Sequence, residues 1–358
     1  MIRRIACILL TLGIILTAIP CMAQDEPEQT PFKVLCIGHS YSLNATEYLC
    51  RLALSQGVDM TVGVAFSGNC SSTTHLHALE KDWVYGESGD VSRGYYKKYT
   101  PDTPEGENLH KTLTEMICDE DWDCIIFQDK VDDAGFFDVF KEDLAALAGQ
   151  VRAMRGLRRT KFLYHRFWSL EKTEYIPQNG SVDMFTNYDD DQATMDAALQ
   201  EAGDKAAALI GAQIIPCGDA FTLARESGRY DPTADGISLN KDTSAHASNA
   251  GKYLAACVWY EMLTNRIPDK VTAFSPFDGS DELIGFATDS VKASGGFLLD
   301  GEPHRFVPGS AEEKTEKAPR RPFPWKVLLY IAAGLVVLVL VALIAKKRDN
   351  AWRRIRRR

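Results

Sequence analysis

The chain has 358 residues, of which 45% are hydrophobic and 25% charged, so it can bury a full core. Its net charge is −9, and because both ends of the chain are basic, the part between them is more acidic than this total. An acidic domain does not attract nucleic acid or anionic lipid, so we expect no nucleic-acid partner and a ligand that is neutral or cationic.

The N-terminal end has the pattern of a secretory signal. Arg3 and Arg4 precede an apolar run that ends before small residues, so we expect residues 1–23 to be a signal peptide cleaved after Ala23. Pro20 stands where a lipoprotein signal has a small residue, which argues against lipid attachment at Cys21. The signal indicates export of the domain that follows.

The C-terminal end predicts a membrane anchor. Residues 301–324 are rich in charge and proline and predict a linker, and residues 325–345 are apolar enough to predict one transmembrane helix. Residues 346–358 form a basic tail, which the positive-inside rule assigns to the cytoplasm. We therefore expect the domain at 24–300, with its core at 32–265, to face the periplasm or cell surface, and the membrane to be a partner through the C-terminal helix.

The first segment of the core predicts a strand, a tight turn and a helix. Residues 32–37 are rich in β-formers, Gly38 permits the turn, Ser40 follows, and residues 45–54 have a helical pattern. A serine between a strand and a helix is well placed for a nucleophile, since the turn exposes its hydroxyl. The alternative is that Ser40 only caps the helix.

Strands and helices alternate along the rest of the core. The pattern predicts strands at 60–65, 124–127, 161–164 and 213–216, helices at 109–118, 140–155, 195–210 and 250–263, and a long polar surface loop at 80–108. This alternation predicts an α/β fold: a three-layer sandwich with a central, mostly parallel sheet. In such sheets a ligand lies beyond the carboxyl ends of the strands.

Several polar residues follow the predicted strands, and they are candidates for binding an ester. The backbone N–H groups of Ser40 and Gly68 and the side-chain amide of Gln128 could donate to an oxyanion. His165, Arg166 and Trp168 could line a substrate pocket. The alternatives are an ordinary turn glycine, a polar residue at a strand end, and packing at the rim of the sheet.

A nucleophilic serine also needs a base, and His246 is the best candidate. It lies in a polar loop before the last helix, and Asp242, four residues earlier, could orient its ring. The alternative is that His246 is only a solvated loop residue. Cys36, Cys124, Cys217 and Cys257 lie in apolar patterns that indicate buried thiols, and no cysteine or histidine spacing indicates a disulfide framework or a metal site.

These segments resemble the SGNH (GDSL-like) hydrolases, and more narrowly the DUF4886 branch. The motifs are KVLCIGHSYS at 33–42, SGNC at 67–70, DCIIFQ at 123–128, HRFWSL at 165–170, IIPCGDAFTLAR at 214–225 and AHASNAGKYLAACVWYEML at 245–263. The resemblance implies a flavodoxin-like fold, Ser40 as nucleophile and His246 as base. It also implies an oxyanion hole of Ser40, Gly68 and, where the superfamily often has asparagine, Gln128, with no metal or cofactor.

Two positions depart from the family pattern. Asp242 is four residues before His246, where three is usual, which leaves the third triad member open. His39 stands where this branch often has asparagine, and we group it with the substrate pocket. The sequence therefore predicts a membrane-anchored extracytoplasmic serine esterase for small acyl esters, most plausibly acetyl groups on carbohydrate. The alternatives are a catalytically silent glycan-binding or scaffold protein and a phospholipid-directed lipase that prefers long acyl chains.

Overall fold

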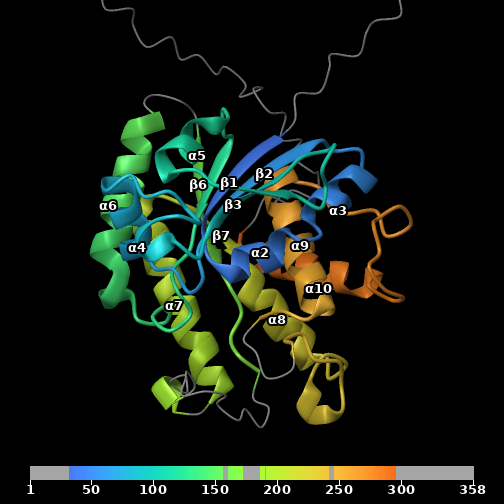
Figure 1. Cartoon of the computed structure of the whole chain (residues 1–358). Helices are drawn as coiled ribbons and strands as arrows, with labels where there is room; N and C mark the ends of the chain where they lie inside the picture. The colour runs from blue at the N-terminus through green and yellow to red at the C-terminus, as the bar shows by residue number, and fades with distance from the viewer. Residues whose placement is uncertain (1–31, 156–159, 172–185, 190, 242–245, 296–358) are drawn as a thin grey trace, which may run out of the picture. The chain divides into compact units, whose positions relative to one another are not determined.

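The computed structural model describes residues 32–155, 160–171, 186–189, 191–241 and 246–295 (Figure 1). All of them belong to the first of two compact units of the chain, Met1–Pro308. The predicted signal, linker, transmembrane segment and basic tail lie outside the described residues, as does Asp242. The domain boundaries predicted at these segments therefore stay predictions.

A seven-stranded sheet in the order β4-β3-β2-β1-β5-β6-β7 forms the middle layer. The strands are β1 (Phe32–Gly38), β2 (Met60–Phe66), β3 (Tyr95–Tyr99), β4 (Glu107–Leu109), β5 (Cys124–Phe127), β6 (Lys161–Arg166) and β7 (Gln213–Pro216). The five strands β2, β1, β5, β6 and β7 pair in parallel. Strand β3 pairs antiparallel with β2, and β4 pairs antiparallel with β3. The sheet is thus mostly parallel, as the sequence predicts.

The central strand β1 is apolar from Val34 to Ile37 because both of its faces are covered there. Val34 and Cys36 point into one hydrophobic core, and Leu35 and Ile37 point into the other. Side chains alternate between the faces of a strand, so a continuous apolar run is typical of a strand buried between two layers of helices.

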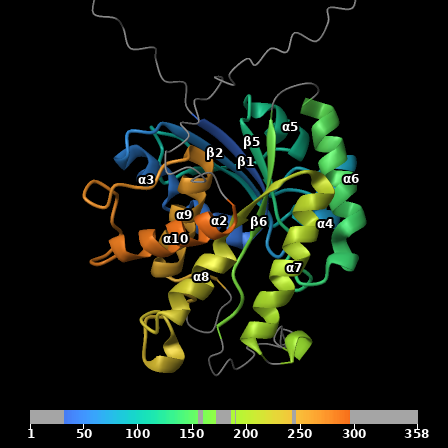
Figure 2. The same cartoon turned by 180° about the vertical axis from the view of Figure 1, so that it is seen from behind.

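Helices cover both faces of the sheet, as Figures 1 and 2 show from opposite sides. One core contains residues of α2 (Ser40–Thr46), α3 (Leu49–Ser55), α8 (Cys217–Glu226), α9 (Asn249–Thr264) and α10 (Asp281–Ala293). The other contains residues of α4 (Ser72–Glu80), α5 (Leu113–Asp119) and α6 (Phe137–Arg155), and α7 (Gln192–Ile210) contributes to both. Short 3-10 turns lie at Gly89–Val91, Thr186–Tyr188 and Pro232–Ala234. This is the predicted three-layer sandwich.

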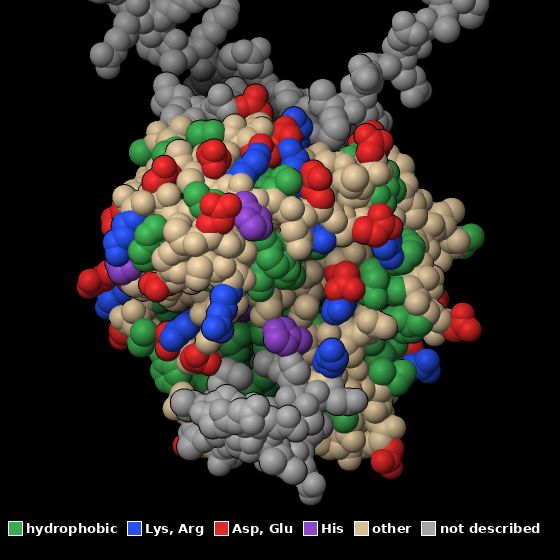
Figure 3. All heavy atoms as spheres, in the orientation of Figure 1, with side chains coloured by type: hydrophobic (Ala, Val, Ile, Leu, Met, Phe, Trp, Pro, Cys, Tyr) green, Lys and Arg blue, Asp and Glu red, His purple; other side chains and the backbone are tan. Residues whose placement is uncertain are grey.

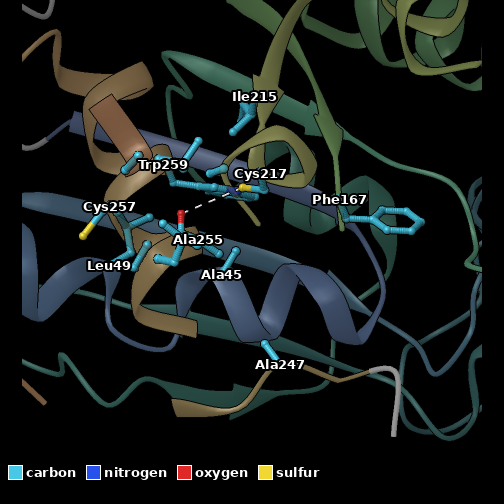
Figure 4. Packing of buried hydrophobic residues seen from close by; sticks show 14 of the residues in the cluster. Ala45, Leu49, Phe167, Ile215, Cys217, Ala247, Ala255, Cys257 and Trp259 are labelled. Carbon is cyan, nitrogen blue, oxygen red and sulfur yellow. Dashed lines mark hydrogen bonds between the residues drawn. The ribbon is translucent and has the colours of Figure 1, made fainter. Parts of the chain in front are cut away.

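Helix α9 is buried along most of its length, which explains its apolar sequence. Figure 4 shows this packing, in which the Cys217 thiol donates a 3.9 Å hydrogen bond to the backbone oxygen of Ala255. Cys36, Cys124, Cys217 and Cys257 are all buried and free, so the prediction of buried thiols is confirmed.

The fold-class prediction is wrong in one part. It includes a C-terminal transmembrane helix, whereas no helix in the described part of the chain combines the length and the apolar character needed to cross a membrane. The longest described helices, α6 and α7, have 19 residues each, but charged residues are spread along them because one face of each helix is in water. The segment that predicts the membrane helix, 325–345, is not among the described residues.

The structure also corrects the predicted loop at 80–108 and the predicted helix at 45–54. The first contains β3 and the beginning of β4, which extend the sheet beyond β2. The second is two helices: α2 begins at Ser40 itself, and α3 follows after Tyr48. Ser40 is therefore the first residue of a helix rather than part of a loop.

Candidate active site

Ser40 is the first residue of α2, directly after the tight turn at His39 that follows β1, and it is half-buried. The N-cap of α2 is His39, whose Nδ1 accepts a hydrogen bond from the backbone N–H of Tyr41 at 3.4 Å. Gly38 is required for close packing, because a Cβ atom there would lie 2.5 Å from Ser42 Oγ and 2.7 Å from Gln128 Nε2. Since His39 already caps the helix, the Ser40 hydroxyl is left for another role.

The strand register brings the three predicted oxyanion donors to one edge of the sheet. Gly38 at the end of β1 pairs with Phe66 at the end of β2, and Ser40 and Gly68 each follow two residues later. Ile37 pairs with Phe127 on β5, so the next residue, Gln128, lies beside Gly38. The Gly68 α-carbon faces open space, since no atom lies within 4 Å of where its Cβ would be. These three residues follow three neighbouring strands, as the sequence predicts.

The Gln128 amide is held in one orientation. Its Oε1 accepts a 2.8 Å hydrogen bond from Nδ1 of His165, and both side chains are buried. In the described part of the chain its Nε2 has no hydrogen-bond partner, and this atom lies next to Gly38. His165 thus directs the amide N–H group toward the turn that carries Ser40.

Three buried histidines surround the turn and are neutral at neutral pH. Burial lowers the pKa of His39 to about 4 and the pKa values of His75 and His165 to about 3. His39 Nε2 donates to the Asp129 carbonyl at 2.8 Å, and His75 Nε2 donates to the Gly38 carbonyl at 3.1 Å. His39 and His75 thus bind backbone carbonyls at the strand ends, whereas His165 binds the Gln128 side chain.

His246 lies beside the first turn of α2, although it is some two hundred residues away in sequence. Asn44 Oδ1 accepts a 2.9 Å hydrogen bond from the backbone N–H of Ala247, the residue after His246. The imidazole of His246 has its ring centroid 6.3 Å from that of Tyr41, the residue after Ser40. The structure therefore brings the predicted base to the predicted nucleophile's turn.

The pKa of His246 is lowered from its usual value, first by the burial of part of the ring and then by the positive charges of Lys241 and Lys252. A histidine with a lowered pKa is unprotonated at neutral pH, which is the state that a general base requires. Asp242 lies outside the described residues, so its role as the third triad member stays a prediction.

The other predicted pocket residues are less open than the sequence indicates. Arg166 forms ion pairs with Asp204, at 2.5 Å, and with Asp219. Trp168 is fully buried and stacks on the rings of Tyr41 and Phe221, each with a centroid distance of 4.5 Å. Trp168 therefore packs against the residue that follows Ser40, whereas the Arg166 guanidinium is paired with carboxylates on α7 and α8.

Sequence reasoning misses three residues that shape the site: Asn44, His75 and Asp129. Asn44 is one helical turn after Ser40, a spacing that could have drawn attention to it. His75 lies on α4, which the pattern does not predict. Asp129 directly follows Gln128, and burial raises the pKa of its carboxyl to about 6, although Oδ1 accepts from the Lys130 N–H at 2.9 Å.

The position of the His246 loop depends on Gly251. A Cβ atom there would collide with the backbone oxygen of Leu239 and lie 3.1 Å from Ala247 Cβ. We expect Gly251→Ala to lower the thermal stability and to reduce ester hydrolysis at least about tenfold, because the loop would move away from Ser40. The matched control is Gly285→Ala in α10, where no atom lies within 4 Å. Alanine there should stabilise the protein by about 0.5–1 kcal/mol, and equal effects of the two variants on activity would contradict the interpretation.

The fold and the site together define a class: three-layer α/β proteins with a serine at the turn after the first strand and a histidine loop beside it. The chain belongs to the DUF4886 family, described as a domain of unknown function, whose model matches residues 33–281. None of the curated proteins matches the chain in sequence.

Among solved structures, a DUF4886 family protein from Bacteroides uniformis is 28% identical, with a TM-score of 0.61, and the match covers 75% of this chain and 98% of that one. A lipase/acylhydrolase from Enterococcus faecalis is 12% identical (TM-score 0.38; 64% and 94% covered). An acetylxylan esterase from Geobacillus stearothermophilus is 13% identical (TM-score 0.31; 66% and 96% covered).

Proposed function

We propose that the protein is a serine esterase that hydrolyses small acyl esters, with acetyl groups on carbohydrate as its substrate class. The observation that carries the proposal is the hydrogen bond between Ala247 and Asn44, which holds the His246 loop against the helix that begins at Ser40. A hydroxyl and an unprotonated imidazole at one turn, next to backbone N–H groups, are the components of acyl transfer.

In the proposed mechanism Ser40 Oγ attacks the ester carbonyl while His246 takes its proton. The oxyanion of the tetrahedral intermediate accepts hydrogen bonds from the N–H groups of Ser40 and Gly68 and from the Gln128 amide. His246 then gives the proton to the departing alcohol, which leaves an acyl group on Ser40. Water, deprotonated by His246, releases the acid and restores the serine. Asp242 would orient the imidazole.

Three features support this role for these residues. Gln128 Nε2 has no partner among the described residues, so a substrate oxygen could accept from it without displacing another bond. Gly68 faces open space, so a substrate could approach its N–H closely. The buried histidines leave His246 as the base, since burial keeps His39, next to Ser40, from taking a proton near neutral pH.

The predicted signal segment supports a location outside the cytoplasm, in the periplasm or at the cell surface. The acidic composition disfavours anionic lipid as a substrate. We therefore propose export through residues 1–23 and an ester of a glycan rather than of a phospholipid.

The proposal predicts that a fluorophosphonate probe labels Ser40. The labelling rate should rise with pH below pH 6.5 and level off near neutrality, because the pKa of His246 lies below its usual value and only the neutral ring accepts a proton. Peptide mass spectrometry locates the modified residue. Asp129 also titrates in this pH range, since burial raises its pKa to about 6. The Asp129→Asn variant cannot ionise there, so a pH dependence that it keeps belongs to His246.

Heat-denatured protein is the control and should not react, because labelling needs the folded site. An intact mass that stays unchanged after long exposure of the folded protein would contradict the esterase. That result would instead support a glycan-binding protein that keeps the fold without turnover.

A further inference from the structure

A groove of about 340 Å³ runs along α2 and α3. It starts near the candidate active site and leads away from it. Its lining residues come from the two helices on one side, from β3 on the other and from the β3–β4 hairpin at the far end: Leu43, Glu47, Arg51, Tyr95, Lys97, Tyr99 and Glu105. On the face that Figure 3 shows, side chains of both charges are interspersed. The side of the groove formed by β3 and the hairpin lies in the segment at 80–108 that the sequence predicts as a long polar loop.

One end of the groove is lined by neighbours of the residues at the candidate active site. Leu43 is three residues after Ser40 on α2, so the two side chains share one face of the helix. The Tyr95 ring has its centroid 4.7 Å from that of Phe66, which precedes Gly68 by two residues. The groove therefore begins on the side of the site where the alcohol part of a bound ester would extend past Leu43 and Tyr95.

The charged side chains of the groove already have partners. Arg51 pairs with Glu105 at 2.9 Å, and Glu47 pairs with Lys252 at 2.6 Å. The Lys97 ammonium group lies 5.6 Å from the centroid of the Tyr99 ring. The lining has two acidic and two basic residues, so a charged ligand would gain little attraction and would have to compete with these pairs.

The aromatic side of the groove is built to stay in place. Tyr99 is buried and its hydroxyl accepts a 3.5 Å hydrogen bond from Thr46 on α2, while Tyr95 is half-exposed. Gly106 lets the hairpin lie against this wall, because a Cβ there would be 2.7 Å from Lys97 Cε and 2.8 Å from Tyr99 Cδ1. Tyr96, in contrast, faces the other core and is excluded from the groove.

We propose that this groove binds the neutral sugar chain of the substrate, that is, the alcohol side of the ester that Ser40 attacks. The inference rests on the proposed esterase function. A tyrosine ring offers an apolar face to the C–H groups of a sugar, and the paired charges offer both donors and acceptors to its hydroxyls without demanding a charged partner.

The length of the groove sets the expected chain length. On the helical side, Leu43 and Arg51 belong to the successive helices α2 and α3. On the strand side, four residues separate Tyr95 from Tyr99, about 13 Å. This wall is longer than one sugar ring, so an oligosaccharide should be a better substrate than a monosaccharide.

The test uses the full chain and two sugar acetates, acetylated xylotetraose and glucose pentaacetate. For the parent protein, kcat/KM should be higher for the tetrasaccharide, and Tyr95→Ala should reduce this preference about tenfold by removing one stacking contact. Tyr95→Phe keeps the ring and should keep the preference within about twofold. The matched control is Phe136→Ala, a 37% exposed aromatic residue before α6, which should keep the preference of the parent.

Two further measurements separate the groove from the chemistry. Calorimetric titration of the Ser40→Ala chain with xylotetraose measures binding without turnover, and binding should weaken about tenfold when Tyr95→Ala is added. If no acetate is cleaved but this dependence is seen, the groove stands and the esterase fails. If acetates are cleaved with no chain-length preference, or with one that Tyr95→Ala leaves intact, the groove assignment is wrong. A stronger preference for an acetylated oligogalacturonide, an anionic chain, would also overturn it.

Discussion

Ser40→Ala should abolish the hydrolysis of 4-nitrophenyl acetate, with a fall in kcat of at least about 10³-fold. The physical reason is that alanine leaves the oxyanion donors intact but removes the atom that forms the acyl-enzyme, so only the slow attack of water remains. Stability should change by no more than about 0.5 kcal/mol, because His39 rather than Ser40 caps α2 and Ser40 is only half-buried.

Initial rates and chemical unfolding of the purified variant and parent measure both quantities. Ser42→Ala is a useful comparison, since Ser42 lies on the same helix but is fully buried and accepts a hydrogen bond from the Cys36 thiol at 2.9 Å. That variant should lose stability and retain the nucleophile. A Ser40→Ala protein that cleaves the ester at the parental rate would end the assignment of the nucleophile.

The second large effect concerns stability and a carboxyl group far from the site. Glu261 on α9 is fully buried, and burial raises its pKa to about 8, although Thr288 on α10 donates a 2.7 Å hydrogen bond to Oε1. In the unfolded chain a glutamate has its pKa near 4.3. Between these two values the unfolded state loses its proton while the folded state keeps it.

The contribution of Glu261 to stability should therefore fall as the pH rises from about 5 to 8, and level off above the folded-state pKa. The buried His39, His75 and His165 have lowered pKa values and act in the opposite direction below about pH 6.5, so the test is the difference between variant and parent. Glu261→Gln keeps the shape but cannot ionise, so its stability relative to the parent should increase with pH, reaching a gain of a few kcal/mol at pH 8 over the difference seen at pH 5. Urea unfolding at several pH values measures this. Parallel pH profiles for variant and parent would show that Glu261 does not titrate between the two states.

Much of the parallel core can be predicted from the sequence. The predicted strands at 124–127 and 213–216 match β5 and β7, and the predicted helix at 250–263 differs from α9 by one residue at each end. β5 and α9 are buried along most of their length, and β7 ends in a buried Ile215 and Pro216, so their apolar runs are easy to recognise. The sequence also singles out Gly38, two residues before Ser40, but the close contact that excludes a side chain there is seen only in the structure.

The elements that the sequence does not reveal are at the edges. Strands β3 and β4 lie among glycines and prolines, and β3 has the sequence YYKKY, in which tyrosine and lysine occur on both faces. Helices α8 and α10 pack with one face on the core, but they have only 10 and 13 residues, so their period is hard to see. Each of these elements is stabilised by packing rather than by its own propensity.

The sequence by itself determines the order of strands and helices, the two buried faces of β1 and the place of Ser40 at the first turn, because these follow from local apolar pattern and backbone sterics. Only the tertiary structure decides that His246 lies beside that turn. The contact that holds it there, between Asn44 and Ala247, joins residues 203 positions apart. No local pattern encodes such a pair, because the two residues are neighbours only in the packed fold and the entropy cost of closing so long a loop is offset by contacts elsewhere in the core.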